Sequence, residues 1–140
     1  MNRDGTEHKA LTDDKQLAIF GRFSPDGTRA LFGVMPKPEK DKRKPPCREL
    51  VVLDIATGKQ TKVEEIPLDA EIQGYSWSPD GKRIAYTWRQ LHDGEPKEVI
   101  DRETESHLVI SDPDGQNAKT ILTEKGQGQW QITLAGVDWR

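Results

Sequence analysis

One seven-residue phrase occurs twice in this sequence and constrains the fold more than any other feature. It consists of an aromatic residue, Ser-Pro-Asp-Gly, one variable residue and Arg, and it occupies residues 23–29 and 77–83. Apolar or aromatic residues follow both copies, at 30–32 and at 84–86. Because a recurring phrase at a long spacing marks one supersecondary unit copied along the chain, the repeat predicts a tandem architecture.

The shared phrase is predicted to form a tight turn between two strands. Pro fixes φ, Asp hydrogen-bonds the local backbone and Gly tolerates a positive φ, so Ser-Pro-Asp-Gly favours a turn. A second pair of similar segments, residues 50–54 and 108–112, is followed by Gly58 and Gly115 and predicts a second hairpin in each copy. Each copy therefore contains four predicted strands, with tight turns after the first and third and a longer connection after the second.

Tandem four-stranded antiparallel units, with an aromatic residue near the end of the innermost strand, are typical of β-propeller blades. Residues 77–86, Trp-Ser-Pro-Asp-Gly-Lys-Arg-Ile-Ala-Tyr, resemble the blade signature of TolB-like propellers, a family of WD-repeat-like β-propeller repeats. The Leu-Thr pairs at 11–12 and 122–123 are similar to the pair that ends a blade in that family. Phe23 stands where the family usually has Trp. The resemblance implies an all-β fold of antiparallel, four-stranded blades.

The repeat predicts a single region with about two complete blades and two partial ones. Residues 1–20 are expected to hold the outer strand of a preceding blade and a connector. Residues 21–73 and 74–133 are expected to form one blade each, and residues 134–140 to begin the inner strand of a next blade. Because propellers typically have four to eight blades, two blades do not close a ring. We therefore expect either an excerpt of a longer propeller or a chain that completes a ring by head-to-tail self-association.

Composition and charge narrow the classes of partner. The formal net charge of −3, from 21 basic and 24 acidic residues, is too small and too mixed to imply nucleic acid or a membrane surface. No apolar run approaches the roughly 18 residues of a membrane span, so membrane insertion is not expected. No signal-peptide apolar core follows the N-terminal residues. Relatives in the resembled family are often periplasmic, and the compartment stays open.

Two charged connectors and one aromatic residue are the candidate partner-binding features. The connector over residues 36–48 is basic, whereas the equivalent connector over residues 89–107 is acidic. The basic connector could dock an acidic partner, or it could be a solvated loop. Trp130, in the connector between blades, is a candidate binding-face aromatic residue, with local packing as the alternative. The candidate partner-binding residues are Lys40, Lys42, Arg43, Lys44 and Trp130.

The repeated aromatic residues are expected to be structural. Phe23, Trp77 and Trp139 recur at equivalent blade positions, and packing between adjacent blades is the simplest role for them. The single cysteine, Cys47, excludes an internal disulfide.

No residue pattern predicts catalysis, a cofactor or a metal site. The three histidines are dispersed and lack zinc-ligand spacing. Ser24 and Ser78 lie in Ser-Pro turns and not in a Gly-x-Ser-x-Gly elbow. Residues 112–117 begin like a calcium loop, but the positions that need Gly and the bidentate Glu hold other residues, so a hairpin turn is favoured.

Two functions are compatible with this sequence. The first is a non-catalytic protein-interaction or scaffold module that binds a protein or peptide, as the resemblance implies for many TolB-like proteins. The alternative is an accessory segment of an enzyme, because TolB-like propellers also resemble the gating domain that precedes the hydrolase domain of prolyl-oligopeptidase-type serine peptidases. In that case catalysis lies outside these residues. The fold alone does not decide, since propellers host many unrelated functions.

Overall fold

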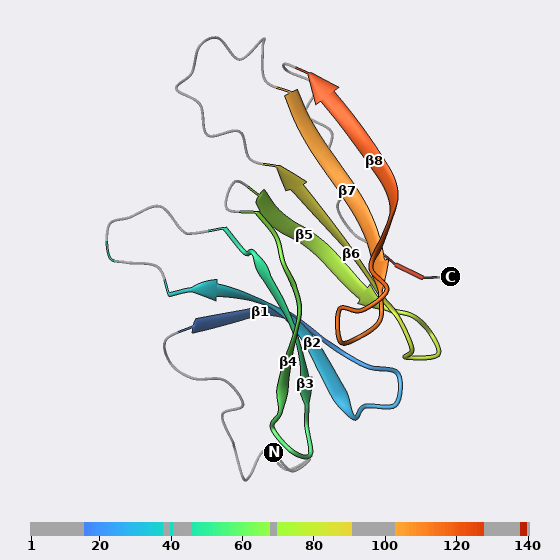
Figure 1. The fold of residues 1–140 in the computed structure, drawn as a ribbon. Helices are drawn as coiled ribbons and strands as arrows, with labels where there is room; N and C mark the ends of the chain where they lie inside the picture. The colour runs from blue at the N-terminus through green and yellow to red at the C-terminus, as the bar shows by residue number, and fades with distance from the viewer. Residues whose placement is uncertain are drawn as a thin grey trace.

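The described part of the chain consists of eight strands, with no helix. The computed structural model describes residues 16–37, 40, 46–67, 70–90, 103–127 and 138–139. The strands form two four-stranded antiparallel sheets, ordered β1-β2-β3-β4 and β5-β6-β7-β8 (Figure 1). Their bounds are β1 Gln16–Phe23, β2 Arg29–Pro36, β3 Glu49–Asp54, β4 Gln60–Glu65, β5 Ala70–Trp77, β6 Ile84–Gln90, β7 Glu103–Ser111 and β8 Lys119–Gln127. The predicted all-β fold of four-stranded blades is confirmed.

The Ser-Pro-Asp-Gly phrase forms the turn from the first to the second strand of each sheet. In the first sheet, the Ser24 hydroxyl donates to the Asp26 carboxylate at 2.6 Å, and the Gly27 N–H donates to the Ser24 carbonyl at 2.9 Å. Residues 78–81 repeat both bonds at 2.6 and 2.9 Å. Gly27 has a φ of 72°, a conformation that suits glycine. The same residues therefore build the same turn twice.

Both sheets begin at earlier residues than the sequence repeat predicts. The first strands start at Gln16 and Ala70, whereas the blades were expected to start at residues 21 and 74. A β-bulge interrupts each of these strands, with register shifts between Ile19 and Arg22 in β1 and after Ile72 in β5. Because a bulge breaks the alternation of side chains, the residues before it do not show a regular strand pattern in the sequence.

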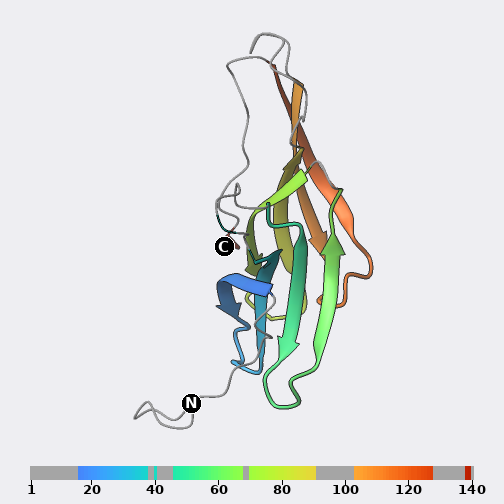
Figure 2. The same ribbon diagram turned by 90° about the vertical axis from the view of Figure 1, so that its left-hand side faces the viewer.

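The partial blades expected at the chain ends are described only in small part. Residues 16–20, expected to belong to a connector, are the start of β1. Residues 1–15 and 134–137 lie outside the described residues. In the second sheet, β7 and β8 are nine-residue strands that extend past the ends of the neighbouring strands (Figure 2).

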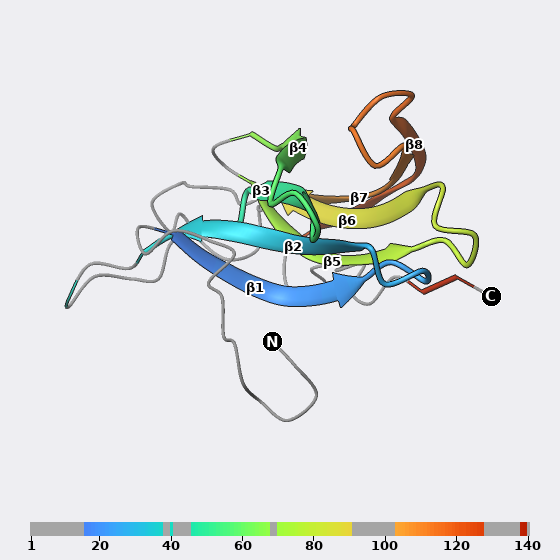
Figure 3. The same cartoon turned by 90° about the horizontal axis from the view of Figure 1, so that it is seen from below.

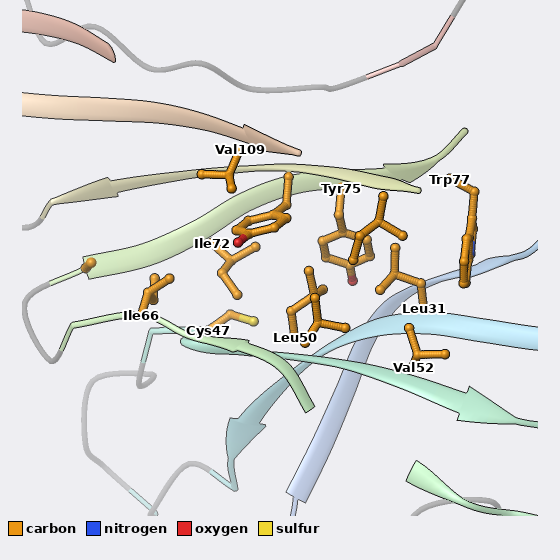
Figure 4. Close-up of a cluster of buried hydrophobic side chains, with 13 residues drawn as sticks. Leu31, Cys47, Leu50, Val52, Ile66, Ile72, Tyr75, Trp77 and Val109 are labelled. Atoms are coloured by element: carbon orange, nitrogen blue, oxygen red, sulfur yellow. The ribbon is translucent and has the colours of Figure 1, made fainter. Parts of the chain in front are cut away.

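One buried cluster holds the two sheets together. β5 lies beside β1 and β2 (Figures 1 and 3). Leu31, Leu50 and Val52 of the first sheet point toward the second, and Tyr75 and Trp77 of β5 point back toward them (Figure 4). The cluster also contains Cys47, Val63, Ile66, Ala70, Ile72, Ile84, Tyr86 and Val109.

The opposite side of the first sheet carries a second, smaller buried cluster. Its members are Phe32, Val34, Val51 and Leu53, with Ala30 packed against them. Phe32 and Val51 are a register pair next to the pair Leu31 and Val52. Because successive side chains of a strand point to opposite faces, the second cluster points away from β5. We call this side of the β1–β4 sheet, which bears Ala30, Phe32, Val51 and Leu53, its outer face.

A glycine on β2 fits where the interior leaves no room for a side chain. A Cβ on Gly33 would lie 2.6 Å from the Cys47 Sγ and 3.4 Å from the Tyr75 hydroxyl. Burial raises the pKa of the Cys47 thiol to about 11, so the sulfur that fills this space is a neutral thiol near pH 7.

We expect the substitution Gly33→Ala to lower the free energy of unfolding by about 1–3 kcal/mol, because a methyl group there overlaps the packed sulfur. Urea unfolding measures the change. Gly21→Ala is the matched control, since a Cβ at Gly21 meets nothing within 4 Å. It should change stability by less than about 0.5 kcal/mol. Equal effects of the two substitutions would contradict the assigned crowding at Gly33.

The turn of the first sheet predicts a lowered pKa for the Asp26 carboxyl group. The hydrogen bond from Ser24, followed by bonds from the Thr28 backbone and hydroxyl, lowers the pKa of Asp26 from 3.8 to about 2. Because the folded pKa is lowered, this contribution to stability is present above pH 3.8 and is lost as the pH falls through about 2. Ser24→Ala should raise the Asp26 pKa toward 3.8, as followed by NMR titration of the carboxyl group. The lowered pKa of Asp54, which depends on Thr57, should not move.

Candidate functional site

A tyrosine hydroxyl of the second sheet is inserted into the backbone pairing of the first. The Tyr75 hydroxyl donates to the Ile19 carbonyl and accepts a hydrogen bond from the Gly33 N–H at 2.8 Å. Ile19 and Gly33 are a register pair of β1 and β2, beside the β1 bulge. Burial raises the pKa of Tyr75 to about 12, so the hydroxyl keeps the proton that it donates. This contact joins three strands from two sheets.

A tryptophan at the end of β5 makes the second polar contact between the sheets. The Trp77 Nε1 donates to the Arg22 carbonyl of β1 at 3.1 Å. The Arg29 guanidinium lies 4.7 Å from the centroid of the Trp77 ring, and its Nη2 donates to the Gly81 carbonyl at 2.7 Å. An arginine over an aromatic face is attractive because the ring quadrupole is negative there. Both aromatic residues of β5 thus bind backbone carbonyls beside the β1 bulge.

Phe23 occupies the blade position of Trp77 but has a different environment. Trp77 is 6% exposed, whereas Phe23 is 71% exposed. The expectation that Phe23 packs between blades is therefore wrong for the described structure. Phe23 pairs with Ala30, so it lies on the outer face, where no other described strand packs against the sheet. Phe20, at the bulge with a φ of 53°, is 78% exposed on the same strand.

The candidate docking surface is therefore the pair of exposed phenylalanines on β1, because the other large side chains of the outer face, such as Phe32 and Leu53, are buried. We call Phe20 and Phe23 the β1 phenylalanines. Exposed large apolar side chains of this kind mark interaction surfaces when they gather on one element. The sequence shows both aromatic residues but not their exposure. The spacing Phe-Gly-Arg-Phe breaks strand alternation, and this irregularity is the one signal that could have pointed to them.

Of the sequence-predicted partner-binding residues, the structure describes Lys40 alone. Lys40 is exposed. Lys42, Arg43, Lys44 and Trp130 lie outside the described residues, and the prediction for them is untested. Trp139 is half-buried, and its indole nitrogen is buried with no hydrogen-bond partner within the described structure.

No group of three or more His, Cys, Asp or Glu side chains in the described part of the chain is arranged to hold a metal ion. None of the described segments forms a helix long and apolar enough to cross a membrane.

Several solved structures share this fold at low sequence identity. A protein described as TolB from Agrobacterium tumefaciens has a TM-score of 0.55 and 17% identity, over 93% of this chain and 42% of that one. An oligogalacturonate lyase in complex with manganese has a TM-score of 0.56 and 18% identity, over 81% and 30% of the two chains. An acylaminoacyl peptidase from Pyrococcus horikoshii has a TM-score of 0.52 and 18% identity, over 80% and 18%.

These similarities establish the fold. The two sheets have the arrangement of β-propeller blades and are similar to those of the TolB structure, and this chain spans less than half the length of each of the three proteins. No family model matches the sequence, and no curated protein is significantly similar to it. The fold resemblance seen in the sequence is thus confirmed from the arrangement of the strands.

We expect Tyr75→Phe to weaken the contact between the sheets. The substitution leaves the buried Gly33 N–H and Ile19 carbonyl without the group that bridges them, which costs about 1–3 kcal/mol of the free energy of unfolding. Chemical denaturation measures that loss, and hydrogen exchange locates it. The Gly33 amide should exchange faster, whereas the Gly27 amide in the distant turn should not change. A protected Gly33 amide in the variant would contradict the bridging role.

Proposed function

We propose that this chain is a non-catalytic protein-interaction module built of TolB-like β-propeller blades, and that the β1 phenylalanines are its docking surface. The observation that carries the proposal is the exposure of Phe23. Its equivalent, Trp77, forms the contact between the two blades of this chain. The position that contacts the neighbouring sheet in one repeat is exposed in the other, which supports docking of a further sheet at Phe23.

We infer that a second copy of this chain is the occupant. Within the chain, Trp77 on one face of the β5–β8 sheet already forms the contact between blades, and Phe23 stands at the equivalent position of the first sheet. Two copies in this arrangement present different faces to each other, so the association is head-to-tail. The alternative occupant is an unrelated protein or peptide, and the experiment has to distinguish it from a second copy.

Surface area predicts that this association is weak. A phenylalanine can bury about 150–200 Å², and both β1 phenylalanines are more than two-thirds exposed. At about 25 cal/mol per Å², covering them contributes about 6 kcal/mol. The loss of translational and rotational freedom on association costs about 4–15 kcal/mol. The phenylalanines alone therefore support an association that depends on protein concentration.

The similarity to the acylaminoacyl peptidase favours a second candidate function, an accessory propeller segment of a serine hydrolase. In that case the chain shapes access to a catalytic domain that is not among these residues. A hydrolase domain with a Gly-x-Ser-x-Gly turn encoded after Arg140 would support this alternative. The absence of such a domain would favour the interaction module.

Light scattering at several protein concentrations tests the proposed docking surface. The molar mass of the wild-type chain should rise with concentration, and Phe23→Ser should keep the chain monomeric at the same concentrations. Ile121→Ser is the matched control, because Ile121 is an exposed apolar residue (51%) on the outermost strand β8. It should associate like the wild type.

Far-ultraviolet circular dichroism checks that each variant keeps its β structure. A wild-type chain that is monomeric at every concentration would overturn the second copy as the occupant. Association that survives Phe23→Ser but is lost in Ile121→Ser would place the interface on the opposite side of the molecule.

A further inference from the structure

A small cavity lies between the two sheets, away from the β1 phenylalanines. Its volume is about 180 Å³. Glu64 of β4 and the two residues that follow this strand, Ile66 and Pro67, form the wall from the first sheet. Tyr86 and Trp88 of β6 belong to the wall from the second sheet. Because sites for drug-sized ligands are about 300–1,000 Å³, this cavity has the size for one side chain or a small molecule.

The charge of the cavity wall is negative. Glu64 is the one ionisable carboxylate among the lining residues, which include no Lys, Arg or His. The Tyr86 hydroxyl donates to the Glu64 Oε2 at 2.8 Å. Burial and, after it, the adjacent carboxylate raise the pKa of Tyr86 well above its ordinary value, so this phenol stays neutral. A carboxylate accepts several hydrogen bonds, and Tyr86 supplies one of them.

Aromatic and aliphatic groups form the rest of the wall. The Trp88 ring stacks on His107 of β7, with ring centroids 4.0 Å apart and an interplanar angle of 22°. The His107 Nδ1 lies 3.1 Å from the Thr123 hydroxyl of β8, so the stack is tied to the sheet. Ile66 and Val109 add apolar surface. The cavity thus combines a carboxylate, an anchored indole and an apolar floor.

This combination selects for a cation on an aliphatic stem. An apolar ligand would displace water from the Glu64 carboxylate without replacing its hydrogen bonds, which costs free energy. A cation pairs with the carboxylate and is attracted to the faces of Trp and Tyr. Because Tyr86 already donates to Oε2 of Glu64, a two-pronged guanidinium would have to share that oxygen. A compact ammonium needs only one oxygen.

We propose that the cavity lined by Glu64, Tyr86 and Trp88 is a binding site for an alkylammonium group. The ammonium lies against the Glu64 carboxylate, and the methylene stem lies along Ile66, Pro67 and Val109. The group is either the side chain of a lysine presented by a peptide or a free small amine. The site is on the opposite side of the first sheet from the proposed docking surface, so the two proposals stand independently.

An NMR titration of the whole chain tests this site. The probes are n-butylammonium, Nα-acetyl-lysine amide and, as the neutral analogue of equal length, 1-butanol. The Trp88 indole N–H signal should shift on addition of either ammonium probe, with a dissociation constant on the order of a few millimolar. 1-Butanol should bind at least about tenfold more weakly, since it leaves the carboxylate unpaired. Tighter binding of the lysine amide assigns the site to a peptide side chain, and tighter binding of butylammonium assigns it to a free amine.

Two isosteric variants test whether binding depends on the Glu64 carboxylate itself or only on the net negative charge nearby. Glu64→Gln should weaken binding of both ammonium probes by about tenfold or more, while its amide oxygen still accepts from Tyr86. Glu65→Gln makes the same charge change at the next residue, which is exposed and paired with Lys62 at 2.8 Å, and should leave binding unchanged. Thermal unfolding of both variants checks folding. Equal binding of 1-butanol and butylammonium, or undiminished binding by a folded Glu64→Gln variant, would overturn the proposal.

Discussion

The contact between the two blades depends on one hydroxyl group, that of Tyr75. It stands between a backbone donor and a backbone acceptor of neighbouring strands, Gly33 and Ile19, and so completes the pairing of a sheet to which it does not belong. Three other features follow from this position. The β1 bulge opens the pairing, Gly33 has no side chain to block the ring, and the Cys47 thiol fills the remaining space. The blades are therefore joined by backbone recognition as well as by apolar packing.

The parts of this fold that could be predicted from the sequence are those that depend on local chemistry. Ser-Pro-Asp-Gly specifies its turn through bonds that span two or three residues, so its two copies identified the hairpins and the blade. The strand starts at Gln16 and Ala70 were missed because bulges disturb the alternation on which strand prediction depends. The bulge in β1 lies where Tyr75 of the second sheet bonds to the first sheet. This contact joins residues more than 40 positions apart, and no local sequence pattern indicates it.

The candidate site was harder to predict than the fold, for a related reason. Sequence equivalence places Phe23 and Trp77 at the same position of a blade, but burial depends on what lies against that position. Trp77 meets the neighbouring sheet, whereas Phe23 points to the outer face. The cavity is a similar case, because Glu64 and Tyr86 belong to different blades and are 22 residues apart. The charged connectors are conspicuous in the sequence but lie largely outside the described residues, and the features found in the described part come from strands and the residues that directly follow them.

The bulge in β1 also affects whether a strand of another molecule can add to the edge of the first sheet. β1 is the edge of its sheet, and a regular edge offers evenly spaced donors and acceptors to any incoming strand. Phe20 has a left-handed backbone conformation in the middle of this edge, so the spacing is broken there. A foreign strand cannot extend the sheet along the whole of β1. The irregularity at which the second blade binds thus also makes β1 a poorer template for an added strand.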